Sequence, residues 1–288
     1  PVKSGVAILT QSSNIAINLT MQQRALPIGY MVTCGNQAQM GQAEIASELL
    51  DDPRVTTIGL HIEGFKNLRD WEAFAAKAAA LGKPVVGLKV GTSDQAQAAT
   101  ISHTASLAGS DAGADALFRR LGFIRVKSLA VFLETLKFLH VNGPIPRGAL
   151  ASISCSGGEA SLAADLGKAA GLTFPPLNTQ QRNTLGMALG PKVALANPLD
   201  YHTYIWRDTD AMAKAWTAID DPEIDATMTI VDYPRPDTCD AGDWECATHA
   251  AIRTRQTIGK PTLLVTSLPE LLPEPIAKQL LAHGVTPM

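Results

Sequence analysis

The chain has 288 residues, 46% of them apolar, and a net charge of −3. Because single hydrophobic cores rarely grow past about 250 residues, this length predicts two domains. The small negative charge and the lack of any basic cluster beyond short pairs such as Arg119-Arg120 exclude nucleic acid and anionic membrane surfaces as expected partners. No apolar run approaches the about 20 residues of a membrane span and no leader opens the chain, so we expect a soluble protein.

The first half alternates short β-rich runs with segments of helical periodicity, which is the pattern of a parallel sheet covered on both faces. The predicted strands are Gly5–Thr10, Ile28–Cys34, Val55–Ile62, Pro84–Lys89 and Phe123–Val126. The predicted helices lie near Asn14–Arg24, Gln42–Leu50, Leu68–Leu81, Ala112–Leu121 and Leu129–His140. These strand–helix units make one doubly wound α/β domain, which we place at residues 1–143.

Val141–Gly148 concentrates Pro and Gly, which is typical of a domain boundary, and a second α/β domain follows at residues 144–288. Its predicted strands lie near Ala149–Ser154, Thr227–Val231 and Thr262–Thr266. Its predicted helices lie near Glu159–Ala170, Thr179–Met187, Asp210–Ile219, Ala241–Ile258 and Glu274–His283. Ala188–Asp208 is the least predictable segment. The opening Pro1 and the closing GVTPM, where a new strand begins, suggest that both ends belong to a longer polypeptide.

The four cysteines, Cys34, Cys155, Cys239 and Cys246, are too few and too scattered for a disulfide framework. A reducing, cytoplasmic location fits them best. Cys239, Cys246 and His249 lack a paired CxxC and a fourth ligand, so we expect no metal site.

The two halves open alike, with VAILTQSSNIAINL in the first and LASISCSGGEASLAADL in the second. Each places a helix N-terminus at the carboxyl end of a first strand, where doubly wound sheets bind ligands. The free N–H groups and the dipole of a helix start attract anions, although an ordinary serine N-cap explains either turn taken singly. Two copies, with a histidine loop between them, favour an anion site shared by the domains, and the anion could be a phosphate.

The histidine loop is SHTASLAG, in which His103 has no bulky neighbour to pack against. A nucleophilic histidine must be neutral and needs its second nitrogen held, commonly by a carboxylate. Glu63 is the best candidate because it ends an apolar strand at the carboxyl edge of the sheet, although a solvated strand-end glutamate would look the same. His61, inside that strand, is expected to be structural.

Several familiar motifs are missing. The chain has no G-x-x-x-x-G-K-[ST] loop and no G-x-G-x-x-G after its first strand, so neither ATP binding by that loop nor a dinucleotide fingerprint is supported. The serine turns also lack the G-x-S-x-G of a nucleophile elbow, which argues against a serine hydrolase.

The motifs taken together resemble the NDP-forming acyl-CoA synthetases, which comprise ADP-forming acetate–CoA ligase, its fused bacterial relatives and, more distantly, succinyl-CoA synthetase. The resemblance covers nearly the whole chain in one order. It rests on SHTASLAGSD with KPVVGLKVGTS and HIEG before it, on TQSSNIA, CGNQA, SCSGGEASLAAD and NPLD. It implies two flavodoxin-like domains taken from the centre of a larger ligase.

The resemblance also implies a mechanism that runs through an acyl phosphate. His103 would be the phosphohistidine and Glu63 its orienting carboxylate. The helix starts would cradle the phosphoryl group, with Ser12, Ser13, Ser156, Gly157 and Gly158 as the phosphate-binding residues. This chain would need no cofactor of its own, and the complete enzyme would use CoA and Mg-ATP or Mg-ADP.

The partners that the resemblance implies are a CoA-binding Rossmann domain and an ATP-grasp domain, in the same or a partner chain, and a small carboxylic acid. A homodimer with a second copy of this chain stays open. Without those domains the fragment is expected to be inactive. Thr33–Met40 and Asn197–Trp206 are the candidate loops for the choice of acid.

Two departures from the family pattern put Ser13 and Ala105 where the relatives keep glycine. Two other readings stay open. One is a regulatory domain without ligase activity, as in some protein acetyltransferases, and the other is a flavin-binding protein.

Overall fold

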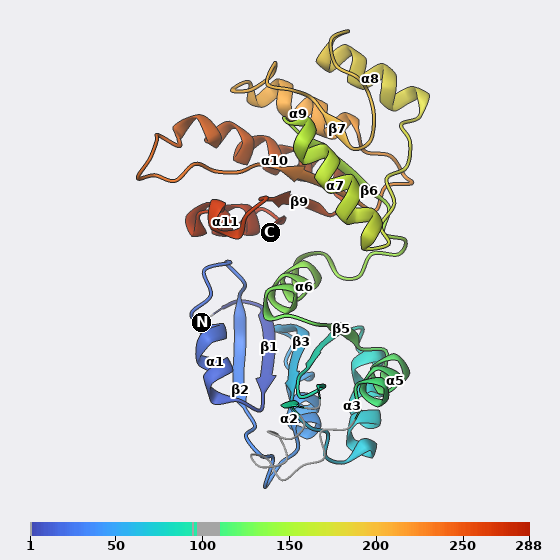
Figure 1. Ribbon diagram of the computed structural model, residues 1–288, viewed down its shortest axis with the longest axis vertical. Coiled ribbons are helices and arrows are strands. Elements are labelled where there is room, and N and C mark those ends of the chain that lie inside the picture. Colours follow the sequence, from blue (N-terminus) through green and yellow to red (C-terminus); the bar gives the residue numbers. More distant parts are fainter. Residues whose placement is uncertain (1, 94, 97–109) are drawn as a thin grey trace. The chain divides into compact units, whose positions relative to one another are not determined.

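The computed structural model describes residues 2–93, 95–96 and 110–288 and divides the chain into two compact units, Pro1–Pro144 and Ile145–Met288 (Figure 1). We call them unit 1 and unit 2. Each is an α/β unit built on a five-stranded sheet whose strands all run parallel. In both sheets the first strand lies between the second and the third, as in flavodoxin, so the predicted fold class is confirmed.

Unit 1 has the sheet order β2-β1-β3-β4-β5. The strands are β1 (Gly5–Thr10), β2 (Ile28–Thr33), β3 (Val55–Ile62), β4 (Val85–Lys89) and β5 (Ile124–Val126). The helices are α1 (Ser13–Thr20), α2 (Gln42–Leu49), α3 (Leu68–Ala80), α5 (Asp111–Leu121) and α6 (Leu129–Asn142). The central strands are buried on both faces, which is why their sequences are continuous apolar runs.

Helices cover both faces of this sheet, and each face has its own apolar core. On one face α2, α3 and α5 bury a cluster that includes Trp71, Phe74 and Phe118. On the other face α1 and α6 pack against β1, β3 and β4, and Phe132 and Leu136 of α6 are fully buried there.

Unit 2 has the sheet order β10-β9-β8-β6-β7. The strands are β6 (Leu150–Ser154), β7 (Leu199–Asp200), β8 (Ala226–Ile230), β9 (Thr262–Val265) and β10 (Val285–Pro287). The helices are α7 (Gly157–Ala169), α8 (Thr179–Leu189), α9 (Thr209–Ala218), α10 (Glu245–Ile258) and α11 (Glu274–Ala282). One core, around Tyr201 and Trp216, joins the sheet to α8, α9, α10 and α11.

Strand β7 lies in Ala188–Asp208, the segment whose sequence shows no clear pattern. The strand is short because hydrogen bonds of a neighbouring side chain hold this segment to β6. The Asn197 side chain accepts from the Ser152 N–H at 3.0 Å and donates to the Leu150 carbonyl at 2.9 Å. Two residues of strand then suffice to place Asp200 at the carboxyl edge. A strand of that length leaves no periodicity in the sequence.

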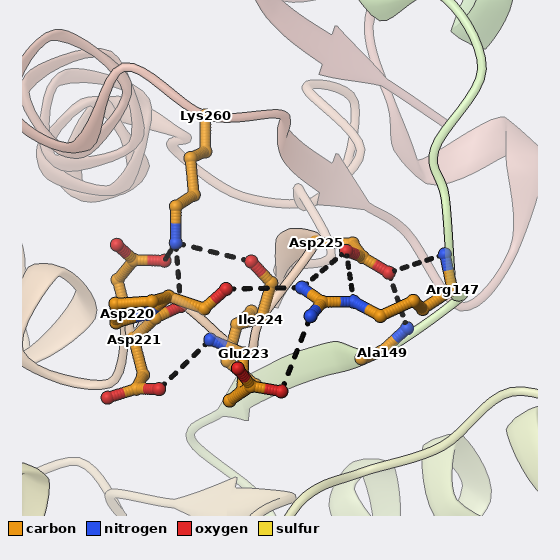
Figure 2. A network of polar contacts seen from close by, with 9 residues as sticks. Arg147, Ala149, Asp220, Asp221, Glu223, Ile224, Asp225 and Lys260 are labelled. Atoms are coloured by element: carbon orange, nitrogen blue, oxygen red, sulfur yellow. Dashed lines mark hydrogen bonds and ion pairs between the residues drawn. The ribbon is translucent and has the colours of Figure 1, made fainter.

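A buried carboxylate fixes the amino edge of the unit 2 sheet (Figure 2). Asp225 accepts from the backbone N–H groups of Arg147 and Ala149 at 3.0 Å and pairs with the Arg147 guanidinium. Burial alone would raise the pKa of Asp225, but these donors bring it below its ordinary value. Beside it, Lys260 binds the Asp220 carboxylate and the carbonyls of Asp221 and Ile224.

In the described ranges, none of the helices combines the length and apolar character needed to cross a lipid bilayer.

Close packing in unit 1 can be tested at Gly87, where an added Cβ would overlap the Phe118 ring. We expect Gly87→Ala to lower the free energy of unfolding by about 2 kcal/mol, because an overfilled core must shift. Gly186→Ala is the matched control, since its Cβ meets only Leu195, at 4.0 Å, and alanine favours a helix. Urea unfolding of both variants measures the difference. Equal stability of the two would contradict the packing described.

Candidate functional site

The start of α1 lies at the carboxyl end of β1 and is prepared by side-chain hydrogen bonds. Ser12 is the N-cap, and its hydroxyl accepts from the Ile15 N–H. The Thr10 hydroxyl donates to the Ser12 carbonyl at 3.2 Å and accepts from the Ser12 N–H at 3.0 Å. The N–H groups of Ser13 and Asn14 open the helix and have no partner within it, which makes this end a potential anion site.

The Gln11 side chain joins this helix start to the end of β3. Its Oε1 accepts from the N–H groups of Glu63, at 3.0 Å, and Gly64, at 2.9 Å, and its Nε2 donates to the Gly64 carbonyl at 2.8 Å. Gln11 is 9% exposed. The backbone that carries Glu63 is therefore fixed beside the start of α1 by one amide.

Two more glutamines extend this network. Gln42, fully buried, accepts from Gln11 at 3.1 Å and donates to the carbonyls of Leu9 and His61. Gln37, in the loop after β2, accepts from the Gln42 N–H at 2.8 Å and donates to the Gly64 carbonyl at 3.3 Å. The sequence pointed to the loops but not to this function of the glutamines, because most of their partners lie far away along the chain.

Glu63 follows β3 directly and is half-buried. Among the residues that the structure describes, the Glu63 carboxylate has no hydrogen-bond or ion-pair partner, so it is available to a further group. Lys89, 6% exposed at the end of the neighbouring β4, donates to the Glu63 carbonyl at 3.0 Å and to the Val90 carbonyl. Burial lowers the pKa of Lys89, and the positive charge of Arg125 lowers it further.

His61 lies within β3 and is 3% exposed. Its Nδ1 is 3.0 Å from Thr10 Oγ1. Thr10 Oγ1 has one proton, so if it donates to the Ser12 carbonyl, His61 Nδ1 is the donor to Thr10 and Nε2 is the unprotonated nitrogen. Burial, and then the charge of Lys89, lower the pKa of His61 to about 4, so the ring is neutral at neutral pH.

His103 and Ala105, in SHTASLAG, lie outside the described residues. The chain on both sides of that segment is anchored to unit 1. Before it, the Val90 N–H donates to the Ile62 carbonyl at 3.0 Å, so the chain leaves β4 beside Glu63. After it, Asp111 at the start of α5 pairs with Arg125 of β5.

The start of α7 in unit 2 repeats the arrangement of α1. Ser156 is the N-cap, and the Ser154 hydroxyl donates to its carbonyl at 3.0 Å, as Thr10 donates to Ser12. Gly157 and Gly158 form the first turn. A Cβ on Gly157 would lie 3.3 Å from the Asp200 carboxylate, so glycine relieves crowding there.

Unlike α1, the start of α7 is surrounded by acidic groups. Burial raises the pKa of Glu159 to about 7, and the negative charges of Asp232 and Asp200 add to the effect. Asp232 accepts from the N–H and the hydroxyl of Ser267 at 2.7 and 2.6 Å. An anion at this helix start would meet two carboxylates and a third that is half ionised near neutral pH.

Ser13, where the family pattern has glycine, occupies an ordinary helical position: it is exposed and absent from the residues with positive φ. Its Cβ therefore strains nothing in this backbone. Across the residues that the structure describes, no three His, Cys, Asp or Glu side chains gather in a way that could hold a metal ion.

Comparison with known proteins gives a family match for residues 3–139, described as "Succinyl-CoA ligase like flavodoxin domain". An ADP-forming acetate–CoA ligase of Methanocaldococcus jannaschii is 29% identical over 69% of this chain and 28% of its own length. The alpha subunit of acetate–CoA ligase (ADP-forming) II of Pyrococcus furiosus is 29% identical over 81% of this chain and 50% of its own length. A trans-feruloyl-CoA synthase from an unknown prokaryotic organism is 27% identical over 81% of this chain.

Two solved structures share the fold. The dinucleotide forming acetyl-coenzyme A synthetase 1 of Ca. Korarchaeum cryptofilum, in complex with phosphate and ADP, matches all of this chain and 62% of its own, with a TM-score of 0.82 and 22% identity. A protein of Pyrococcus horikoshii matches 99% of this chain and 61% of its own, with a TM-score of 0.78. This chain thus spans half or less of the two ligases first compared and under two thirds of the solved chains.

The glutamine network predicts a large effect of Gln11→Met. The substitution keeps the length of the side chain but leaves the N–H groups of Glu63 and Gly64 without their acceptor. We expect the free energy of unfolding to fall by about 3 kcal/mol, at about 1–3 kcal/mol for each buried donor. Gln180→Met, on the exposed side of α8, is the control. Chemical denaturation measures the free energy of unfolding of both variants. A loss for Gln11→Met no larger than that of the control would contradict a stabilising role of the Gln11 hydrogen bonds.

The raised pKa of Glu159 predicts a stability that depends on pH. The folded state holds the Glu159 proton more tightly than the unfolded chain, so its stabilisation is complete below about pH 4.5 and is lost as the pH rises through about 7. Glu159→Gln, which mimics the protonated acid, should be more stable than the parent at about pH 8, by on the order of 1–2 kcal/mol, and similar to it below about pH 4.5. Urea unfolding at both pH values is the measurement, with exposed Glu270→Gln as control. A difference independent of pH would count against the assignment.

Proposed function

We propose, from the homology of this chain over most of its length to ADP-forming acetate–CoA ligases, that it is the central part of an NDP-forming acid–CoA ligase acting through a phosphohistidine. The single observation that carries the proposal within the structure is the Glu63 carboxylate. It is fixed by its backbone beside the start of α1 and next to the chain that leads to His103.

The proposed reaction, written in the direction that consumes acyl-CoA, has three steps. Phosphate attacks the acyl carbon of the thioester and releases CoA, which leaves an acyl phosphate. A nitrogen of neutral His103 then attacks phosphorus, and the P–O bond to the acyl oxygen breaks, which releases the carboxylate. Finally a terminal oxygen of the nucleoside diphosphate attacks phosphorus, so the N–P bond breaks and the triphosphate forms with His103 regenerated. The reverse order makes acyl-CoA from acid, CoA and triphosphate.

Glu63 is proposed to accept a hydrogen bond from the N–H of the His103 ring. That bond holds the tautomer in which the reacting nitrogen is unprotonated, and it stabilises the positive charge that the ring gains when it becomes phosphorylated. Lys89 supports this function indirectly, because its ammonium group donates a hydrogen bond to the Glu63 carbonyl. The neutral His61 adds no charge there.

The helix starts are proposed to bind phosphoryl oxygen atoms, with Ser12 and Ser13 in unit 1 and Ser156, Gly157 and Gly158 in unit 2. The chain has no basic cluster to neutralise a phosphoryl group. The free N–H groups and the positive dipole ends of these helices would supply the positive potential instead. The acidic surroundings of α7 make binding there depend on the protonation of Glu159.

The remaining parts of the enzyme are proposed to lie outside this chain. The comparisons support this, since relatives are longer and one is a subunit of a ligase. A CoA-binding Rossmann domain and an ATP-grasp domain would bring CoA and Mg-ATP or Mg-ADP, and the substrate would be a small carboxylic acid. The acetyl-coenzyme A synthetase 1 of Ca. Korarchaeum cryptofilum, which shares the fold, is in complex with phosphate and ADP.

The test is phosphorylation of the complete enzyme by ATP labelled in its γ-phosphate. The parent should acquire an acid-labile, base-stable label, and His103→Ala should abolish it because the phosphoryl acceptor is gone. Glu63→Gln should slow labelling by about 10- to 100-fold, since the ring loses its orienting partner. The rate is measured by quenched-flow sampling over a range of pH.

His249→Ala is the matched control, because His249 is an exposed histidine of α10. It should label like the parent. Label that persists in His103→Ala would refute the assignment. No label in the parent, together with an acetyltransferase domain in the same polypeptide, would instead favour a regulatory domain.

A further inference from the structure

A cleft of about 310 Å³ runs along α7 of unit 2, between this helix and the face of the sheet formed by β6, β8 and β9. Its walls are almost entirely apolar and include Leu162 and Leu166 of α7, which are 48% and 61% exposed. Met228 and Val265, on its floor, are only half-buried although their strands lie inside the sheet. Such a face is unusual in a doubly wound fold, where both sides of a parallel sheet are normally covered.

The matching face of unit 1 is covered. Counting from the N-cap serines, Ser12 and Ser156, places Leu150 at the position of Val6 and Ser152 at that of Ile8. The sheet register extends this correspondence to the next strand. Ile8 pairs with Gly59 and Ser152 pairs with Met228, so Met228 is the equivalent of Gly59.

The same register continues to the next strand. His61 pairs with Leu88, and Ile230 pairs with Val265, so Val265 stands where Leu88 stands in unit 1. Leu88 is 3% exposed because α6 lies over it. The floor of the cleft thus corresponds residue by residue to the surface that α6 covers.

Helix α6 shows which element fits such a surface. It follows the edge strand β5 after two residues and crosses β1, β3 and β4 beside α1 (Figure 1). Phe132 and Leu136 pack on Gly59. The edge strand of unit 2 that corresponds to β5 is β10.

One end of the cleft is polar. Glu159 lines it, and its Oε2 is buried with no hydrogen-bond partner among the residues that the structure describes. In unit 1 the equivalent position is Ile15, which packs in the core under α6. The group that fills the cleft must therefore offer apolar side chains along most of its length and a hydrogen-bond donor at the Glu159 end.

We propose that the cleft receives an amphipathic α-helix that follows β10 in a longer polypeptide, packed over β8 and β9 beside α7 as α6 packs over β3 and β4 of unit 1. The relatives are longer than the region that they share with this chain, and the proposal requires that part of such extra length follow β10. The helix carries an apolar stripe against Leu162, Leu166, Met228 and Val265, and a donor that reaches Glu159. This proposal is independent of the ligase activity.

The first test is site-specific photocrosslinking in the full-length protein. A p-benzoyl-phenylalanine replaces Leu166, and irradiation of the purified protein is followed by mass spectrometry of the crosslinked peptides. The expected product joins position 166 to a peptide that follows Met288. The same residue at position 187, where Met187 is 81% exposed on α8, is the control and should give no such product.

Three results would overturn the proposal. A crosslink to a peptide within residues 2–288 would mean that another part of this chain fills the cleft. A crosslink between light and heavy isotope-labelled copies would mean that a second molecule does. No crosslink above the control would mean that the cleft is open to solvent.

The second test is thermal unfolding of full-length Leu166→Asp. An aspartate at an exposed position costs little, but under a packed helix it is buried without a partner. We expect the melting temperature to fall by about 5 °C, whereas Met187→Asp should leave it nearly unchanged. Leu166→Met, which keeps the volume and the apolar character of the side chain, should have the melting temperature of the parent. Equal melting temperatures for the two aspartate variants would contradict a covered cleft.

Discussion

The candidate site depends on a single buried amide, that of Gln11. Its oxygen accepts from the N–H groups of Glu63 and Gly64, and its nitrogen donates to the Gly64 carbonyl. Its own backbone leads directly into Ser12, the N-cap of α1. The backbone of Glu63 is therefore tied to the helix start. Leaving either end of a buried amide unsatisfied costs about 1–3 kcal/mol, so the arrangement also stabilises the carboxyl edge of the sheet. Gln42 and Gln37 hold Gln11 in turn, which makes the network rigid before any ligand arrives.

Strands and helix starts, which depend on residues close together in the chain, could be predicted from the sequence. Strands such as Gly5–Thr10 and Val55–Ile62 were predicted to the residue, because they are buried on both faces and appear as continuous apolar runs. The likeness of the two helix starts was also visible, and the structure supports it with the same hydrogen bond, from Thr10 to Ser12 and from Ser154 to Ser156. Helix α1 ends at Thr20, before the predicted Arg24: its C-cap, Met21, leaves helical geometry (φ −89°, ψ 8°), and Ala25 takes a positive φ in the turn that leads to β2.

What the sequence could not give depends on groups that meet only in the folded chain. Nothing local distinguishes Gln11 or Gln42 from a surface glutamine, because the partners of their side chains lie 19 to 53 residues away along the chain. The acidic environment of α7 was missed for the same reason, since Glu159, Asp200 and Asp232 come from three separate segments. Two helix starts that look equivalent in the sequence are therefore unequal in charge. The start of α1 has Lys89 and a neutral His61 nearby, whereas that of α7 has carboxylates.

The two units also differ in how their sheets are covered, and one pair of equivalent residues shows the consequence. In unit 1 the strand position under α6 is Gly59, and any larger residue would collide with Phe132 and Leu136. In unit 2 the equivalent position is Met228, whose side chain rises from the sheet into the cleft. A helix packed there must lie farther from the sheet than α6 does, or must carry a small residue over Met228. The proposed covering helix would therefore need small residues at the centre of its apolar stripe and large ones on either side. This is the reverse of α6, which places Phe132 and Leu136 over a glycine.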